Sequence, residues 1–559
     1  MKKSTILILT IFLGFYSYSQ SCLEDDLLIT TQEQIDSFSE NYPGCTDVLG
    51  SIEIIGTGSN IISLEGLTQL ETIQESFIVK YCSGLVDFAG LQNVQSIGAD
   101  FKIFSCHYMI ELTLDNLNFV GGDFGMSSSA FMETISLDVL ASVGGNFSIG
   151  ATLSLVEIYI PVLSSVGLEF SITGTGVTEI DIPELSYISS SIDIEWNHNL
   201  TSINAPNLSS IGGLSFQTNQ LLEYFNVSIE TSNFPGSILI TDNPEMTNLS
   251  FLPNIFNIAG SLKLTNIPIT DIDVLANLST IGGGLHIELP LISSLESFSN
   301  LTSVGGDLRI KDNNSLVSLS GLENINAVNG QFVINYNENL TSLEGIQNVS
   351  AINGILCIAH NPSLMDVSDI NVPNGNVSLE LIDNQSLGNL DGFENIGLLS
   401  GWIQIYGMPL LENLDFLNNI NISSGAGFDI MGNINLSVCN QPIICQAMAE
   451  NPGGTYFQGN APGCNTNEEV EASCEIVGIA EINEVNNTIY PNPSEGLFNI
   501  SMNEFEILTV FNSLGNVVIS KANINNVFEI DLTQYPKGVY MVVINGAKGI
   551  HSIERIVKQ

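Results

Sequence analysis

The residues of this chain that are best able to do chemistry are its carboxylates. The sequence holds 60 Asp and Glu residues against 12 Lys and Arg, which gives a formal net charge of −48 at pH 7. Two carboxylates can cleave a polysaccharide as acid, base or nucleophile, provided that they converge on one glycosidic bond. Candidate groups are Asp193, Glu195, Glu288 and Glu380, but nothing in their spacing brings them together.

Other catalytic and metal-binding patterns are missing from the sequence. It has no GxSxG, HExxH, phosphate-binding glycine loop or EF-hand loop, no CxxC pair, and its five His residues are scattered. The negative charge excludes a protein that binds the nucleic-acid backbone and disfavours binding to anionic lipid. The sequence therefore predicts no enzymatic activity, no metal and no cofactor.

The elements that must position these side chains are short strands that recur along most of the chain. A pair of apolar residues separated by one position occurs seventeen times, from Ile52/Ile54 to Phe428/Ile430, at intervals of 22 to 25 residues. A period of this length indicates a solenoid, because one unit cannot bury its apolar side alone. Each repeat reads as three short extended segments joined by Gly and Asn bends, without room for a helix. We therefore expect an all-β chain, a right-handed parallel β-helix of about 17 turns.

Residues beside the two core positions of a strand point away from the core. The five basic residues between Ile52 and Ile479 all occupy such positions, so we expect them on the outer face of one sheet, together with two aromatic residues and the free thiol of Cys357. The candidate binding face comprises Lys80, Lys102, Lys263, Arg309, Lys311, Trp402 and Tyr406. The alternative is that the basic residues only relieve repulsion among neighbouring carboxylates.

A column of Asn stands three residues beyond the second core position. Asn tolerates left-handed turns, and its amide both donates and accepts hydrogen bonds, so a stacked column could satisfy the backbone at a corner of the coil. The alternative is that Asn is merely favoured in turns. The column comprises Asn197, Asn219, Asn243, Asn313, Asn337, Asn361, Asn384 and Asn433.

The repeat consensus resembles that of the receptor L domain. It is seen in Leu316-x-x-Leu319-x-Gly321-Leu322-x-Asn324-Ile325 and in the run from Leu301 to Leu308. The resemblance implies a right-handed β-helix like the ligand-binding lobes of insulin-type and epidermal-growth-factor-type receptors. It therefore favours a binding protein over an enzyme, although the stack predicted here is far longer than one receptor lobe.

The first twenty residues read as a secretory signal, with Lys2 and Lys3 before an apolar run. Export permits disulfides. Cys22 and Cys45 bracket a short predicted helix with a capping box, which we expect to close the N-terminal end of the solenoid. Cys82 and Cys106 stand in one column of adjacent coils, within reach of a disulfide. Four further residues lie where the repeat ends, with three possible connectivities and metal binding as the alternative: Cys439, Cys445, Cys464 and Cys474.

The last 70 residues or so read as several short strands with turns between them, typical of a small antiparallel β-sandwich. They resemble the C-terminal sorting domain of the bacterial type IX secretion system. The resemblance rests on Tyr490, Pro491, Asn492, Pro493, Gly496, Gly538, Tyr540 and Lys558. It implies export by the type IX machinery, removal of the domain by a sortase, and attachment to surface lipopolysaccharide.

These observations predict a secreted protein displayed on the outer cell surface that uses its solenoid for binding or adhesion to a protein or glycan. The alternatives are a polysaccharide-degrading β-helix enzyme and an inert surface spacer. The expected segments are a signal peptide (1–20), an N-terminal cap (21–50), the solenoid (51–436), a Cys-rich cap (437–475), a linker (476–487) and the sorting domain (488–559).

Overall fold

The computed structural model describes residues 20–58, 60–229, 231–423, 425–477, 488–546 and 549–559. The predicted signal peptide up to residue 19, and most of the predicted linker, lie outside the described residues. The chain divides into two units, Met1–Asn467 and Glu468–Gln559, which are described separately.

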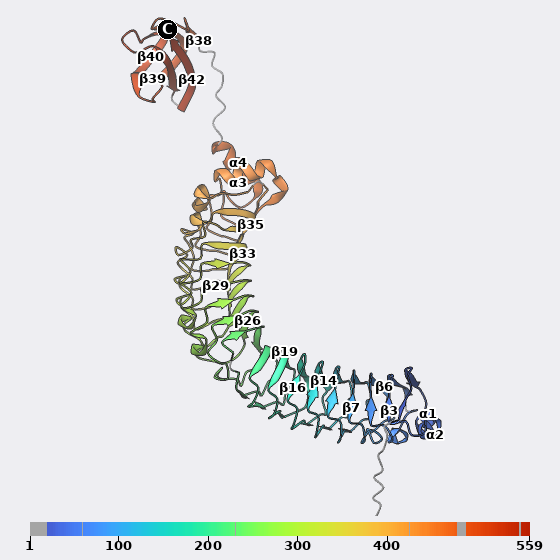
Figure 1. Cartoon of the computed structure of the whole chain (residues 1–559). Helices are drawn as coiled ribbons and strands as arrows, with labels where there is room; N and C mark the ends of the chain where they lie inside the picture. Colours follow the sequence, from blue (N-terminus) through green and yellow to red (C-terminus); the bar gives the residue numbers. More distant parts are fainter. Residues whose placement is uncertain (1–19, 59, 230, 424, 478–487, 547–548) are drawn as a thin grey trace, which may run out of the picture. The chain divides into compact units, whose positions relative to one another are not determined.

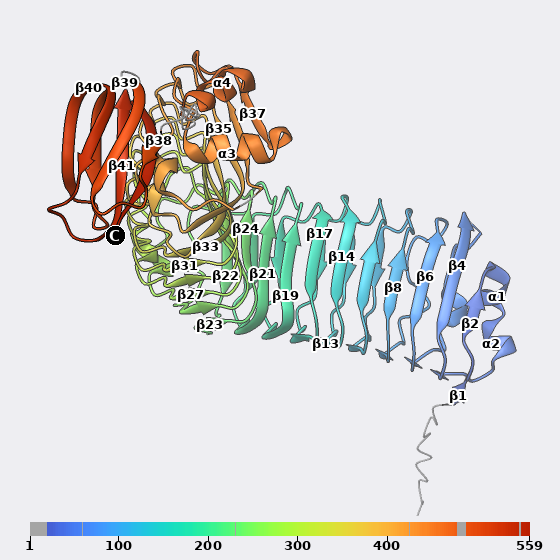
Figure 2. The ribbon, with the colours of Figure 1, turned by 90° about the horizontal axis from the view of Figure 1, so that it is seen from above.

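Unit 1 is a parallel β-solenoid of about 19 turns, as the repeat predicts. One strand from each coil pairs in parallel with its equivalents in the neighbouring coils to form what we call the main sheet (Figures 1 and 2). Its strands are β2 (Leu27–Ile29), β4 (Ile52–Gly58), β6 (Phe77–Cys82), β8 (Phe101–Phe104), β11 (Phe124–Ser127), β14 (Phe147–Thr152), β17 (Phe170–Thr175), β19 (Tyr187–Glu195), β21 (Ser210–Gln217), β24 (Ile238–Thr241), β26 (Leu262–Thr265), β28 (Leu285–Glu288), β30 (Leu308–Lys311), β32 (Phe332–Asn335), β33 (Ala351–Ala359), β34 (Asn376–Ile382), β35 (Leu398–Tyr406), β36 (Gly427–Met431) and β37 (Thr455–Gln458).

Shorter elements complete each coil. Two-residue strands precede the main strand in many coils: β1 (Ser21–Cys22), β3 (Asp47–Val48), β5 (Thr72–Ile73), β7 (Ser96–Ile97), β10 (Phe119–Val120), β13 (Ser142–Val143), β16 (Ser165–Val166), β23 (Asn233–Phe234), β25 (Asn257–Ile258), β27 (Thr280–Ile281), β29 (Ser303–Val304) and β31 (Ala327–Val328). A further six-stranded parallel sheet consists of β9 (Glu111–Thr113), β12 (Thr134–Ser136), β15 (Glu157–Tyr159), β18 (Glu179–Asp181), β20 (Ser202–Ala205) and β22 (Tyr224–Val227). Single 3-10 turns are η1 (Glu65–Leu67), η2 (Asp273–Leu275), η3 (Glu296–Phe298), η4 (Phe393–Asn395), η5 (Asp415–Asn419) and η6 (Pro452–Gly454).

The solenoid extends by one coil at each end beyond the seventeen repeats seen in the sequence. Strand β2 pairs with β4 in register, and β36 pairs with β37. Both extra strands lie in segments predicted as caps. The sequence pattern hides β37 because Thr455 stands at its first core position, where the other coils have an apolar residue, although Thr455 is just as buried.

The core is a continuous stack of apolar side chains, because in-register parallel strands place equivalent residues one above the other. In the N-terminal coils the first core position is Phe in five consecutive strands. The stacked rings have centroids 5.0 to 6.1 Å apart, from Phe77 through Phe101, Phe124 and Phe147 to Phe170.

The Asn column forms a buried ladder of side-chain amides. Asn337 is representative: its Oδ1 accepts from the main-chain N–H of Asn313 at 3.0 Å, and its Nδ2 donates to the carbonyl of Ile310 at 3.0 Å and to Asn361 Oδ1 at 3.1 Å. All eight predicted residues are completely buried. The corner itself is made by the residue before the Asn, for example Tyr336 at φ 57°. The left-handed residue is therefore not the Asn, whose amide is instead aimed inward.

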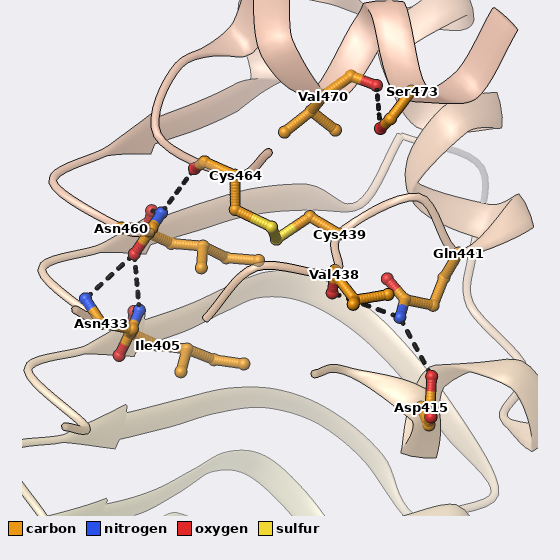
Figure 3. The surroundings of a disulfide bond; sticks show 11 residues. Ile405, Asp415, Asn433, Val438, Cys439, Gln441, Asn460, Cys464, Val470 and Ser473 are labelled. Atoms are coloured by element: carbon orange, nitrogen blue, oxygen red, sulfur yellow. Dashed lines mark hydrogen bonds between the residues drawn. A yellow bond between two sulfur atoms is a disulfide. The ribbon is translucent and has the colours of Figure 1, made fainter. Parts of the chain in front are cut away.

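The ladder has a further member beyond the predicted column. Asn460, just after β37, accepts from the main-chain N–H of Asn433 at 2.9 Å and donates to the carbonyl of Cys464 at 2.9 Å (Figure 3). Cys464 forms a disulfide with Cys439, with 5.6 Å between the two Cα atoms. The disulfide therefore closes the coil in which the ladder ends. Nearby helix α3 (Pro442–Glu450) follows Cys439.

The N-terminal end agrees with the sequence prediction. Helix α1 (Gln32–Asp36) begins at a capping box in which Thr31 and Gln34 exchange hydrogen bonds, and α2 (Phe38–Asn41) follows it. Cys22 and Cys45 form a disulfide across this segment. Cys445, on helix α3, also takes part in a disulfide, as does Cys474 of unit 2.

The predicted disulfide between Cys82 and Cys106 is wrong, since both are free and buried. They occupy the ladder column, upstream of the Asn residues. The Cys82 thiol donates to the carbonyl of Lys80 at 3.4 Å, and the Cys106 thiol to that of Phe104 at 3.6 Å. Both side chains thus take the same orientation toward their own coil. The two thiols are neighbours, since a side-chain hydrogen bond from Cys106 lowers the pKa of Cys82, but the two sulfur atoms are not joined.

Glycines line one corner of the N-terminal coils, where successive backbones approach closely. A Cβ on Gly121 would lie 2.0 Å from the carbonyl oxygen of Gly98, and one on Gly144 would lie 2.1 Å from that of Gly121. The backbone must shift to accept any side chain there.

We therefore expect Gly121→Ala to destabilise the solenoid by about 3 kcal/mol, within the range of severe core substitutions. The control is Gly125→Ala in the same coil, where the nearest atom to an added Cβ is Ser148 Oγ at 3.4 Å. Urea unfolding followed by circular dichroism measures both. Equal unfolding midpoints for the two variants would contradict the close-approach argument.

Unit 2 contains helix α4 (Asn467–Val477), most of which lies in this unit, and an antiparallel sheet. Its strands are β38 (Thr488–Tyr490), β39 (Leu497–Phe511), β40 (Val517–Asp531), β41 (Gly538–Gly546) and β42 (Gly549–Lys558). Two strands of 15 residues, β39 and β40, replace several of the short strands expected from the sequence. The sheet has its own buried core, which includes Phe498, Val510 and Ile556.

Candidate recognition surface and sorting domain

The five basic residues lie on outward positions of the main sheet, as predicted from their spacing. The structure places them in two separate groups: Lys80 and Lys102 on the adjacent strands β6 and β8, and the other three on β26 and β30. Trp402 and Tyr406 lie farther along, on β35. One face therefore carries the whole candidate set, but no single patch does.

Carboxylates of the same face neutralise the first group. Lys80 pairs with Glu53 at 2.7 Å, and Lys102 pairs with Asp100 at 2.6 Å and Asp123 at 2.9 Å. Burial alone would lower the pKa of Lys102, but the hydrogen bonds and charges of its two partners outweigh burial and raise that pKa. These pairs are what the repulsion-relief interpretation predicts.

The second group surrounds a histidine that sequence reasoning overlooked. Lys263, His286 and Arg309 stand in register on successive coils. Burial, and then the charge of Lys263, lowers the pKa of His286 to about 4, so His286 is neutral near pH 7. Arg309 pairs with Asp307 at 2.8 Å, and the neighbouring Lys311 pairs with Glu288 at 3.2 Å.

Cys357 is a free thiol on the outward face, but it is only 9% exposed. It packs among Val333, Ala359 and Ile382, which form a small apolar cluster outside the main core. Burial, and then Glu380, raises the pKa of the thiol to about 12. The prediction of an outward free thiol therefore needs correction: neighbouring side chains bury it.

The candidate catalytic carboxylates do not form one site. Asp193 and Glu195 share β19, whereas Glu288 and Glu380 lie on β28 and β34. Among the described residues, no group of three or more His, Cys, Asp or Glu has the arrangement needed to hold a metal. Asp193 does influence its neighbours: burial, followed by the charge of Asp193, raises the pKa values of Glu169 and Glu195.

A carboxyl whose pKa is raised in the folded state binds more protons in the folded than in the unfolded chain. The stability of the fold therefore falls as the pH rises from the unfolded-state pKa through the folded-state pKa. We expect Asp193→Asn to raise the urea midpoint at pH 7, because it removes the charge that Glu169 and Glu195 must face. The gain should vanish on acidification, once these carboxyls are protonated. The control Asp115→Asn removes an exposed charge. A gain that persists in acid would contradict the electrostatic explanation.

The last coils carry an aromatic group that includes one residue missed in the sequence. Trp402 stacks on Tyr456 of β37, with ring centroids 6.2 Å apart and planes at 22°. The hydroxyl of Tyr406 donates to Asp429 and accepts from Gln404 Nε2. Burial, and then Asp429, raises the pKa of Tyr406. Tyr456 could have been predicted as part of this face only by recognising that β37 is the main-sheet strand of one more coil.

The sorting-signal residues of unit 2 organise its C-terminal strand. Asn492 donates to the carbonyl of Arg555 at 2.7 Å and accepts from the N–H of Val557 at 3.0 Å. Lys558 is 8% exposed, and its amine donates to the carbonyls of Leu532, Thr533 and Tyr535 at 2.6 to 2.8 Å.

The other residues of this set have local roles in turns and strand ends. The Tyr540 hydroxyl donates to the carbonyl of Pro536 at 2.6 Å. Gly496 and Gly538 have φ of 130° and 153°, which L side chains rarely adopt. The peptide bonds before Pro491 and Pro493 are cis, and Tyr490 is exposed.

The fold and these residues define an exported solenoid protein with a separate C-terminal sorting domain. Comparison with known families agrees: residues 279–373 match the receptor L domain, and residues 488–559 match the secretion system C-terminal sorting domain. No curated protein matches the chain. The type IX sorting domain indicates export, so the chain is a cell-surface or secreted protein and interacts with the type IX secretion machinery. Among the described helices, none has the length and apolar character to cross a membrane.

Proposed function

We propose that this chain is a non-catalytic binding or adhesion protein displayed on the cell surface, with the outer face of the main sheet as its recognition face. The observation that carries the proposal is the exposure of Trp402 and Tyr456, which are 44% and 50% exposed on the last coils. Large aromatic side chains bring much contact area and a polar handle, and they are enriched in binding surfaces.

The match to the receptor L domain supports binding rather than catalysis. The basic residues of this face have carboxylate partners, apart from Lys263, for which no ion pair is found among the described residues. We therefore assign them chiefly to the stability of an acidic sheet. The aromatic group in the last coils is the preferred contact region.

Arrays of glycans and proteins probed with the purified full chain test this proposal, beside a hydrolysis screen on plant and marine polysaccharides. We expect retention of a ligand without cleavage. Released oligosaccharides would favour the enzyme, and an absence of both binding and cleavage would favour an inert spacer.

We further propose that a sortase removes the sorting domain and that the solenoid is then attached to surface lipopolysaccharide. This proposal rests on the sorting-domain match. Mass spectrometry of surface material tests it: we expect peptides from the solenoid without peptides from residues 488–559. Recovery of both regions from one intact surface chain would contradict removal.

A further inference from the structure

The aromatic group on the last coils is built as a flat platform. Trp402 pairs in register with Gly427 of the next coil. Because Gly427 has no side chain, the indole lies across it: an added Cβ would be 2.6 Å from Trp402 Cε3. The indole thereby reaches Tyr456, two coils from its own strand. We call Trp402 and Tyr456 the aromatic platform.

Polar groups capable of hydrogen bonding border the aromatic platform. Gln404 stands in register between Glu380 and Asp429 on the neighbouring strands. Asp429 accepts from the Tyr406 hydroxyl through Oδ2, whereas its Oδ1 is buried and has no hydrogen-bond partner among the described residues. Glu380, Gln404 and Asp429 are half-buried, so amide and carboxylate groups other than the buried Oδ1 of Asp429 border the exposed aromatic faces.

This combination matches the chemistry of a sugar ring. The C–H groups of a pyranose pack against aromatic faces, while its hydroxyls need donors and acceptors at the edge. Charge selects among sugars. The sequence contains no Lys or Arg between Lys311 and Lys521, and Glu380 and Asp429 lie beside the platform. Uronic, sulfated and phosphorylated glycans would meet only like charge there.

We propose that the aromatic platform binds a neutral oligosaccharide chain. This proposal rests on the proposed binding function and names the class of its ligand. A protein partner is less suited, because a stable protein interface buries about 800 Å² on each partner around an apolar centre. The two rings have acidic and amide neighbours instead.

The test uses the full chain titrated with neutral hexasaccharides of glucose, mannose and xylose, with oligogalacturonate as the acidic probe. The chain has two Trp residues. Trp196→Phe therefore leaves Trp402 as the sole indole, and we expect saturable quenching or a shift of its fluorescence with at least one neutral sugar. Oligogalacturonate should give no change.

Variants locate the site by calorimetry with the same sugar. We expect Trp402→Ala and Tyr456→Ala each to weaken binding about tenfold or more, as for other stacked ligands. Gly427→Leu should weaken sugar binding to a similar extent, because the new side chain displaces the Trp402 indole from its place although the indole itself is still present. The matched control is Trp196→Ala, which removes an indole that is 55% exposed outside the platform. Circular dichroism confirms that the variants fold.

Three outcomes would overturn the assignment. Sugar binding that is insensitive to Trp402→Ala and Tyr456→Ala would place the site elsewhere and leave the proposed binding function intact. Capture of a protein ligand that depends on Trp402, without sugar binding, would replace the saccharide by a protein. Failure of every neutral sugar to bind at millimolar concentration removes the platform assignment, and only a blank result on the wider arrays as well would remove the binding function.

Discussion

Deleting residues 488–559 is expected to leave the solenoid folded and to reduce its display on the cell surface to background. The physical reason is that unit 2 has its own buried core and its own antiparallel sheet, while the ladder and core of the coils belong to unit 1. The deletion therefore removes the export signal without opening the solenoid. Surface labelling of intact cells measures display, with immunoblots of whole cells as the control for synthesis.

A single substitution should act through the same domain. Lys558→Met removes a buried amine and leaves the carbonyls of Leu532 and Thr533, as well as Tyr535, without this donor. The bond to Leu532 is buried, and a buried acceptor left unpaired costs about 1–3 kcal/mol, a large share of the stability of a small domain. We expect reduced surface display. Lys537→Met, at an exposed position, is the control.

Undiminished surface labelling after the deletion of residues 488–559 would refute the sorting role.

The second large effect is expected from Asn337→Asp in the buried ladder. The change is nearly isosteric, but it replaces the amide donor to Ile310 by an oxygen and places a charge in a completely buried column. Breaking such a buried arrangement costs about 3–5 kcal/mol. Because the coils interact mainly with their neighbours, the weakened coil should also split the unfolding transition into two steps.

Urea unfolding at two pH values checks this prediction. The loss should be greater at pH 7 than in acid, where a buried carboxyl can take up a proton and become neutral. Asn339→Asp makes the same chemical change in the same coil outside the ladder; it removes only a solvent-exposed bond to the carbonyl of Asn314 and should cost much less. Equal losses for the two variants would show that the ladder amides do not stabilise the solenoid.

Much of the fold follows directly from the sequence. In-register stacking places the same kinds of residue at the same position of successive coils. The apolar pairs and the Asn column therefore recur at a regular spacing in the sequence. The capping box at Thr31 and the sorting-domain residues around Pro491 are local patterns, which need no knowledge of distant contacts. The C-terminal coil was missed because β37 carries Thr455 at its first core position. Strand β2 keeps both the repeat spacing and the apolar pair, but its segment was assigned to the N-terminal cap.

The sequence by itself determined the parallel solenoid, the outward positions of Lys102 and Arg309, and the sorting domain. Only the tertiary structure decided what those side chains meet. The structure leaves the neighbouring thiols of Cys82 and Cys106 without a disulfide, and contacts across coils paired Lys102 with two carboxylates and laid Trp402 over Gly427 toward Tyr456. A repeat fixes which column a residue occupies, but its rotamer and its neighbours in the adjacent coils depend on packing, which spacing along the chain does not encode.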